Sequence, residues 1–311
     1  MTPDVVTVTA NPAVDQTVWI PGFRAGEVNR VRRQEVAPGG KGVNVAAFLA
    51  AFGVPTLATG FLGTSNAGLF EDFLAERGIE ARFVPVPGST RTGVKIVDED
   101  AGTTTDINFP GFEVSGDRVA ELEATVASLG RSEAWIALSG SLPPGAPVDL
   151  YARLGAGARE LGMRVAVDTS GPPLSEAVQS TPDLVKPNRA ELEELTGRTL
   201  PDREALAGAA TELVDAGVST VVVSLGREGA LFVRAGEVVF AAAPRVPVAS
   251  TVGAGDAMVA GAITGTLRDM TLIDVAALAT GAAATKIGRV GPHLDAAAAE
   301  AAAKTVAVNP L

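Results

Sequence analysis

Short apolar runs alternate with helix-like segments along most of the chain. Runs rich in β-branched residues predict strands in VVTVTA (5–10), TLATGFLG (56–63), AWIALSG (134–140), RVAVDTSG (164–171), DLVKPN (183–188) and TVVVSLG (220–226). Helical sequence is expected after each run, and glycine closes the first two helices at Gly53 and Gly78. This alternation predicts an α/β fold, with a mostly parallel sheet covered by helices on both faces.

Small or polar residues stand at the carboxyl ends of several predicted strands. They form the segments TANPAVD (9–15), LSGSLPPG (138–145), DTSG (168–171), KPN (186–188) and SLG (224–226). Ligands of parallel α/β sheets bind beyond these strand ends. The sequence therefore predicts a binding site along this edge of the sheet.

Two segments, 15–37 and 89–109, interrupt the alternation with polar hairpin patterns and turns that contain glycine. We expect them to form a small antiparallel β lid outside a core domain made of residues 1–14, 38–88 and 110–311. The core is expected to end in helices, including the alanine-rich tail at 294–308, with no strand between them.

Composition narrows the class of protein. The 311 residues are 47% hydrophobic, contain no cysteine and carry a net charge of −11, which argues against nucleic-acid and anionic-membrane partners. The sequence begins without a signal-peptide pattern and has no apolar run of membrane-spanning length, so we expect a cytoplasmic location. The basic residues between Arg24 and Lys41 belong either to a charged edge strand or to a mouth for an anionic substrate.

The segment STVGAGDAMVAG (250–261) joins a predicted strand at 244–249 to a predicted helix. It is not a dinucleotide fingerprint, because Met258 occupies the third glycine position, and no P-loop is present. Glycines at a helix N-terminus can present N–H groups to an anion, and Asp256 can accept the proton of an attacking hydroxyl. This pairing favours phosphoryl transfer; the alternative is that Asp256 is a helix cap.

A second glycine cluster, APGGKGVNVA (37–46), allows close backbone approach to a ligand. Lys41 adds a positive charge and Asn44 an amide that both donates and accepts hydrogen bonds. A simple turn before a helix has a similar sequence.

GGKGVNVA and STVGAGDAMVAG resemble the two signature regions of the PfkB carbohydrate kinase family, which has the ribokinase-like three-layer α/β/α fold. Further segments match in order over nearly the whole chain, among them GEVNRV, LSGSLPPG, KPNRAELEELTG and VVVSLGREGAL. PGGKGVN, TRTGVKI and TDINFPGFEV resemble the branch that phosphorylates D-fructose 1-phosphate on its 6-hydroxyl. Tagatose-6-phosphate and fructose-6-phosphate kinases of the family, and a non-catalytic sugar-phosphate sensor, remain the alternatives.

The resemblance implies roles for individual residues. Asp256 matches the catalytic base, and Gly253, Ala254 and Gly255 match the anion hole. The residues matched to sugar-phosphate binding are Asp15, Gly39, Gly40, Lys41, Asn44 and Ser139, with Arg91 reaching from the lid and Lys95 assisting it. Gly93 departs from the pattern, since many relatives have asparagine there.

The resemblance also implies ATP and Mg²⁺ as cofactors and a homodimer that forms through the lid. The nucleotide side is matched by Lys186, Asn188, Ser224, Gly226, Gly229, Thr251, Gly253 and Gly255. Asn188 and Glu191 match the motif that organises Mg²⁺ through water. Residues 286–289 lie where some members bind a monovalent cation such as K⁺.

Other polar residues have simpler interpretations. His293 is the only histidine and has no partner at metal or triad spacing, so we expect it in a surface loop. The acidic run 98–100 is expected at a hairpin turn. Asp168 is either functional or a buried strand-end carboxylate that accepts backbone N–H groups.

Overall fold

The structure is a computed structural model that describes residues 2–247 and 250–311. Within these ranges the core sheet has ten strands in the order β14-β13-β12-β11-β10-β9-β8-β1-β4-β5. The strands are β1 (Val5–Thr9), β4 (Thr56–Gly63), β5 (Glu80–Val86), β8 (Trp135–Ser139), β9 (Arg164–Asp168), β10 (Leu184–Val185), β11 (Thr220–Ser224), β12 (Gly229–Arg234), β13 (Glu237–Ala242) and β14 (Val308–Pro310). The neighbouring strands β11-β10-β9-β8-β1-β4-β5 pair in parallel. β12, β13 and β14 add an antiparallel edge beside β11.

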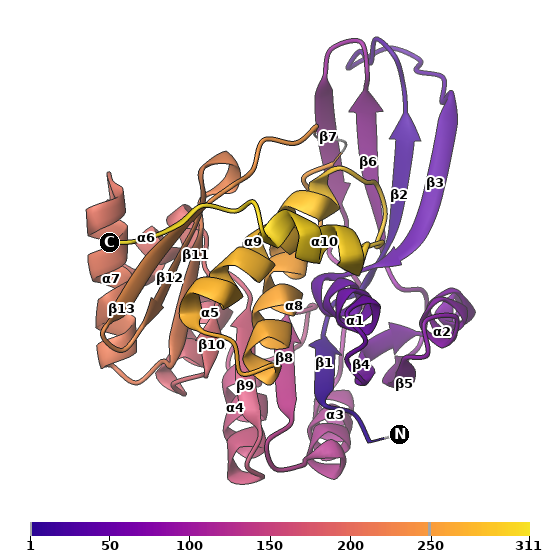
Figure 1. Ribbon diagram of the computed structural model, residues 1–311. Coiled ribbons are helices and arrows are strands. Elements are labelled where there is room, and N and C mark those ends of the chain that lie inside the picture. Colours follow the sequence, from indigo (N-terminus) through magenta and orange to yellow (C-terminus); the bar gives the residue numbers. More distant parts are fainter. Residues whose placement is uncertain (1, 248–249) are drawn as a thin grey trace.

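Helices cover both faces of this sheet, which confirms the expected three-layer fold (Figure 1). One apolar layer contains side chains of α1 (Lys41–Ala51), α2 (Ala67–Ala75), α8 (Ala254–Leu267), α9 (Leu272–Ile287) and α10 (Ala296–Ala303). The other contains those of α3 (Gly116–Leu129), α4 (Leu150–Glu160), α5 (Pro172–Gln179), α6 (Arg189–Thr196) and α7 (Arg203–Asp215). In these ranges no helix combines the length and apolarity that crossing a bilayer requires.

A second sheet projects from the core at the upper right of Figure 1, in the order β3-β2-β6-β7. Its strands are β2 (Ala13–Trp19), β3 (Arg33–Gly39), β6 (Thr92–Asp98) and β7 (Thr103–Asn108). Each expected hairpin pairs in antiparallel fashion, and β2 joins β6 in parallel. Asp98 is the last residue of β6, and its carboxylate accepts hydrogen bonds from N–H groups of both hairpins, including those of Gly22 and Phe23 at 2.9 Å.

Three local predictions were wrong. No helix follows β11; a 3-10 turn at Gly226–Glu228 leads directly into β12, because Gly226 and Gly229 adopt positive φ angles of 58° and 125° that reverse the chain. Residues 244–247 form no strand, since two of these four residues are prolines without an N–H group. The rest of that predicted strand, 248–249, lies outside the described residues.

The alanine-rich tail also departs from the prediction. Its helix ends at Ala303, and β14 follows as the edge strand beside β13, with Val308 opposite Ala241. The β-branched pair Thr305 and Val306 marks the change from helix to strand geometry. Alanine propensity alone predicts that the helix continues to residue 308. Pairing with β13 makes the end of this segment a strand instead.

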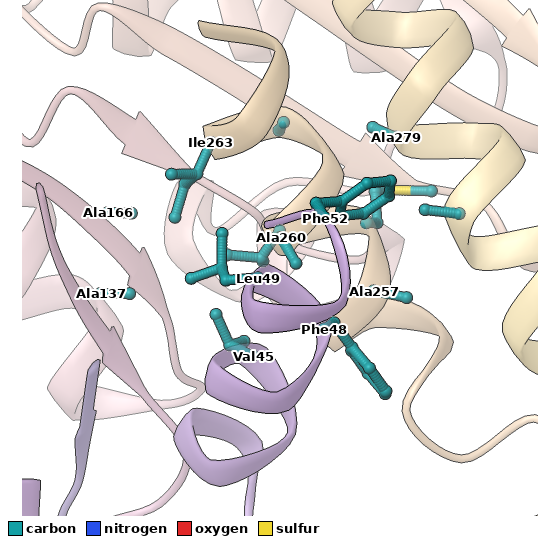
Figure 2. Packing of buried hydrophobic residues seen from close by; sticks show 14 of the residues in the cluster. Val45, Phe48, Leu49, Phe52, Ala137, Ala166, Ala257, Ala260, Ile263 and Ala279 are labelled. Carbon is teal, nitrogen blue, oxygen red and sulfur yellow. The ribbon is translucent and has the colours of Figure 1, made fainter. Parts of the chain in front are cut away.

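Helices α1 and α8 pack directly against each other in the core (Figure 2). Phe48 and Leu49 of α1 are fully buried beside Ala257 and Ala260 of α8. Burying a phenylalanine or leucine side chain contributes about 1.5–3 kcal/mol. This contact fixes the position of α1 relative to α8 and so places polar residues of the two helices close together.

Candidate active site

The N-terminus of α8 lies between two cavities. Gly253, with a φ of 82°, precedes the helix, and Asp256 belongs to its first turn. One cavity, of about 490 Å³, is polar; the other, of about 450 Å³, is largely apolar, and Gly255 lines both. The first N–H groups of a helix have no partner inside it and attract anions. A group that passes from one cavity to the other would therefore meet this helix start.

The polar cavity brings most of the expected substrate residues together. It is lined by Asp15, Gly40, Lys41, Asn44, Arg91 and Lys95, together with Gly253, Gly255 and Asp256. The cavity has further polar lining residues that were not predicted from the sequence, which are Asn11, Asp106, Asn108, Ser141, Thr169 and Ser170. Their positions after strand ends and in the hairpin that contains β7 are the sequence signal by which they could have been found.

Two expected substrate residues do not line this cavity. Gly39 lies beneath Asp15, and a Cβ atom on Gly39 would overlap the Asp15 carboxylate. Ser139 is buried at the end of β8, where its carbonyl accepts a 3.1 Å hydrogen bond from the Tyr151 hydroxyl. Ser141, two residues further on, reaches the cavity instead.

Asp256 is buried, and Nδ2 of Asn44 donates a 2.7 Å hydrogen bond to its Oδ2. Burial raises the pKa of Asp256 to about 6, and the neighbouring Asp168 carboxylate adds to the rise. Lys41, the Asn44 hydrogen bond and Lys186 oppose the rise in pKa. A carboxyl group with this pKa is ionised at neutral pH and is a better proton acceptor than an exposed aspartate.

Asp168 at the end of β9 joins two lysines beneath the helix start. Its Oδ1 lies 2.9 Å from Nζ of Lys41 and 3.2 Å from Nζ of Lys186. Burial alone would raise the pKa of Asp168, but the two ammonium groups outweigh it and lower that pKa. Of the two interpretations left open, the first fits better, because the Asp168 carboxylate pairs with two ammonium groups and accepts no backbone N–H group among the described residues.

Strand β2 and the segment around β6, both in the second sheet, contribute three polar side chains to the polar cavity. Nζ of Lys95 lies 2.8 Å from Oδ1 of Asp15. The Arg91 guanidinium donates to the carbonyls of Phe109 at 3.0 Å and Asn11 at 3.4 Å, and has no carboxylate partner among the described residues. Arg91 therefore keeps a positive charge available to an anionic ligand.

The apolar cavity contains most of the residues expected to bind nucleotide. Ser224, Gly226, Gly229, Thr251 and Gly255 line it, as does Ala254. Other lining residues of this cavity were not predicted from the sequence; they are Arg227, Arg245, Met258, Thr280, Ala283, Ala284 and Ile287. These residues come from elements far apart in the chain, and small apolar residues in a helix carry no functional signal of their own.

Lys186, Asn188 and Gly253 complete the expected nucleotide set but do not line the apolar cavity. Lys186 approaches the glycine loop from below, since a Cβ atom on Gly255 would lie 3.3 Å from its Nζ. Asn188 forms a parallel bridge with Ser224. These contacts place a buried ammonium directly behind the glycine turn that precedes α8.

Asn188 and Glu191 form the N-terminal capping box of α6. The Glu191 N–H donates to Oδ1 of Asn188 at 3.0 Å, and the Asn188 N–H donates to Oε2 of Glu191 at 2.7 Å. The described residues contain no group of three acidic, histidine or cysteine side chains arranged to hold a metal. The oxygen donors fit Mg²⁺ that is bound mainly by water and phosphate, with Glu191 in an outer position.

Lysine is distributed unevenly in this protein. The sequence has five lysines, and four of them, Lys41, Lys95, Lys186 and Lys286, surround the two cavities and the loop between them. Only Lys304 lies elsewhere, exposed after α10. The positive charge of the site is thus concentrated in a protein of net charge −11.

Comparison with known proteins agrees with this architecture. The family model described as pfkB family carbohydrate kinase matches residues 6–298, so the chain belongs to this family of carbohydrate kinases. A curated relative, 1-phosphofructokinase of Rhodobacter capsulatus, is 48% identical over 316 residues, which cover 100% of this chain and 99% of the relative.

Solved structures of phosphofructokinase-2 from Escherichia coli are also similar. One, in complex with substrates and products, has a TM-score of 0.91 at 30% identity and covers 97% of this chain and 98% of its own. Two others, described as the tetrameric inhibited form and as a complex with potassium, have TM-scores of 0.90 and 0.91 at 29% and 28% identity, over 98% of this chain and 99% of theirs.

Proposed function

We propose that this chain transfers the γ-phosphoryl group of ATP to the 6-hydroxyl of D-fructose 1-phosphate, giving fructose 1,6-bisphosphate and ADP. The main support for this proposal is the position of Asp256 and the glycine turn. They lie between a polar cavity that contains lysines and an apolar cavity. The polar cavity suits the sugar phosphate, and the apolar cavity suits the adenosine. The curated relative with 48% identity has this activity in its name.

The reaction needs a proton acceptor and a site for developing charge. As the sugar oxygen bonds to the γ-phosphorus, the bond from that phosphorus to the β,γ-bridging oxygen breaks, and ADP leaves with the electron pair. Asp256 accepts the hydroxyl proton, and the N–H groups of Gly255 and its neighbours stabilise the transferred group. Lys186 behind the turn strengthens this stabilisation.

The phosphate already present on the sugar needs cations of its own. Arg91 is the better candidate, because Lys95 is paired with Asp15 and Lys41 with Asp168. Asn108 faces Gly93 across the β6–β7 pair, and its Oδ1 lies 3.5 Å from where a Cβ atom on Gly93 would stand. We propose that this amide contacts the sugar where many relatives use asparagine.

ATP and Mg²⁺ are the cofactors of this proposal. Glu191 would hold Mg²⁺ through water, with Asn188 keeping the Glu191 carboxylate in place through the capping box. The ion supplies charge neutralisation of the ATP phosphates. K⁺ is not among these cofactors, because residues 286–289, where some relatives bind a monovalent cation, already hold the buried ammonium of Lys286. ATP as the phosphoryl donor supports a cytoplasmic location.

We further propose that the second sheet is a lid and a dimer surface. Its inner face carries Asp15 and Lys95 into the polar cavity. The register aligns Val36, Gln16, Val94 and Ile107 in one row on the opposite face, where Val36 and Ile107 are 47% and 46% exposed. A second copy of the same face would cover this apolar row by two-fold symmetry.

Acceptor specificity tests the proposed reaction directly. The ratio kcat/KM should be measured for D-fructose 1-phosphate, D-fructose 6-phosphate and D-tagatose 6-phosphate with a coupled assay of ADP release. We expect D-fructose 1-phosphate to give the highest ratio. A preference for either other sugar refutes the assigned acceptor, and sugar binding without ADP release makes the protein a sensor.

A further inference from the structure

Lys286 has no part in the reaction described above and, unlike Lys41, Lys95 and Lys186, has no carboxylate partner among the described residues. It lies near the end of α9 and is only 2% exposed. Its Nζ donates a 2.9 Å hydrogen bond to the carbonyl of Arg289, the single protein hydrogen bond found for it within residues 2–247 and 250–311. A buried ammonium with so few partners costs free energy, so its presence needs an explanation other than stability.

The position of Lys286 suggests that explanation. A Cβ atom on Gly253 would lie 3.1 Å from Cε and 3.7 Å from Nζ of Lys286, so the side chain lies directly behind the residue that precedes α8. The same segment holds the loop a second time, because the Ser250 N–H donates a 3.0 Å hydrogen bond to the Ile287 carbonyl. Lys286 therefore contacts the turn before α8 from the end of α9, next to the polar cavity.

A small cavity of about 30 Å³ lies beside Lys286 and is lined by Asp15, Glu35, Asn44, Lys95 and Gly253. This volume accepts one or two water molecules, which can use the remaining ammonium protons. Burial lowers the pKa of Lys286, as does Lys95, whereas the carboxylates of Asp256, Asp15 and Glu35 favour its charged form. The surroundings thus supply negative charge, and space for water, around the ammonium ion.

We propose that Lys286 is a positioning residue that holds a fixed positive charge behind Gly253 and so makes a bound monovalent cation unnecessary for this chain. The charge strengthens the N–H groups at the start of α8 toward the γ-phosphoryl group and holds the turn in shape. This inference rests on the proposed kinase function. Lys286 acts through the turn, not by touching the reacting atoms.

The unmodified protein gives the first test. At constant ionic strength, replacing K⁺ by Na⁺ or by tetramethylammonium should change kcat by less than about twofold, because the cation is covalently attached. A loss of about tenfold or more without K⁺ overturns the proposal. This measurement decides the question even if no Lys286 variant folds.

Lys286→Met removes the charge and keeps much of the side-chain volume, and Lys304→Met is the matched control. We expect Lys286→Met to lower kcat by about 10- to 100-fold. It should also weaken the binding of a non-hydrolysable ATP analogue, measured by calorimetry, more than the binding of ADP, whereas the control should change neither kcat nor these affinities. Asp256 faces Asp168, Lys41, Lys186 and Asn44. Removing the positive charge of Lys286 should raise the pKa of Asp256 and so move the acid limb of the kcat/KM profile to higher pH. Wild-type kcat and an unmoved limb in a folded variant overturn the proposal.

Chemical rescue separates a missing charge from a damaged fold. Lys286→Ala leaves a space beside Gly253, and K⁺, ammonium or methylammonium should restore at least about tenfold of the lost kcat, whereas sucrose should not. Failure of all three cations in a folded variant counts against the proposal. If the wild-type protein releases no ADP, the proposed function fails instead, and the calorimetric affinities for the analogue and for ADP still measure the effect of Lys286.

Discussion

Asn44 donates a 2.7 Å hydrogen bond to Asp256 across 212 positions of the chain. Asn44 belongs to α1 and Asp256 to α8, and the buried contact of Phe48 with the α8 alanines holds the two helices together (Figure 2). The two glycine motifs thus become one site because their helices share a core. The hydrogen bond also favours the ionised form of Asp256 against its burial.

The first prediction concerns Asp256 as proton acceptor. Asp256→Asn keeps the shape of the side chain but cannot take up the hydroxyl proton. We expect kcat to fall by about 10²- to 10⁴-fold while the dissociation constant of ATP changes little. Steady-state kinetics and calorimetric ATP binding measure the two effects. Retention of more than about a tenth of the wild-type kcat contradicts the role of Asp256.

The second prediction is that the same substitution stabilises the fold at neutral pH. The pKa of Asp256 is raised from 3.8 to about 6, so its stabilising contribution is present below pH 3.8 and is lost as pH rises through 6. Asparagine resembles the protonated form at every pH. Asp256→Asn should therefore gain about 1–3 kcal/mol in free energy of unfolding at pH 8 and much less at pH 4.

Urea unfolding at the two pH values measures this gain. Asp269→Asn is a suitable control, because Asp269 is exposed just beyond the other end of α8. This control should change the free energy of unfolding by less than about 0.5 kcal/mol. A variant at position 256 that is less stable than wild type at pH 8 would show that the buried carboxylate is a net stabilising group.

The third prediction follows the pKa of Asp256 into catalysis. The base works only when ionised, so kcat/KM should fall about tenfold per pH unit below an apparent pKa near 6. Asn44→Ala removes the hydrogen bond that favours the ionised form and should move this acid limb to higher pH. Initial rates between pH 4.5 and 8.5, at saturating ATP, provide the profile. A flat profile down to pH 5 is the contrary result.

The fourth prediction concerns recognition of the phosphate on the sugar. Arg91→Ala removes the cation that lacks a carboxylate partner and should raise KM for fructose 1-phosphate by about 10- to 100-fold with a smaller effect on kcat. Arg82→Ala is the control, since Arg82 pairs with Glu80 on the surface. KM for ATP should remain unchanged in both variants. An unaltered sugar KM would remove Arg91 from the binding site.

The fifth prediction addresses the lid. Light scattering coupled to gel filtration should give the wild-type protein twice the 31.5 kDa mass of the chain. Asp substituted for both Val36 and Ile107 should give the monomer mass, because it places charges in the shared apolar row. Val148→Asp is the control, as Val148 is 47% exposed on the core. A monomeric wild-type protein at assay concentration refutes the dimer.

The sequence predicts the layers of this fold well because strand and helix periodicities are local. It also indicates both glycine motifs, since their spacing is visible without the fold. It fails where pairing partners decide the outcome, as in β12 after Gly226 and β14 after the alanine-rich helix. Whether Asp168 contacts amides or ammonium groups is equally invisible, because Lys41 and Lys186 reach it from separate elements.

The residues of the apolar cavity were equally hidden from the sequence. Met258, Ala283 and Ile287 have the apolar character of residues in any core helix, and only the packing of α9 against α8 brings them together around a cavity. In the sequence, Lys286 stands out only as a charged residue at the end of an apolar helix, which is a weak indication of function. Its contact with Gly253 depends on tertiary packing, which no local pattern encodes.

The uneven distribution of lysine has a practical consequence. A protease that cleaves only after lysine meets one exposed target outside the site, Lys304, whereas arginines are spread over the surface. Brief digestion should trim residues 305–311, and with them β14, before it cuts elsewhere. Amine-reactive dyes should likewise mark Lys304 first, which offers a simple way to attach the native protein to a surface while the four lysines around the cavities stay unmodified.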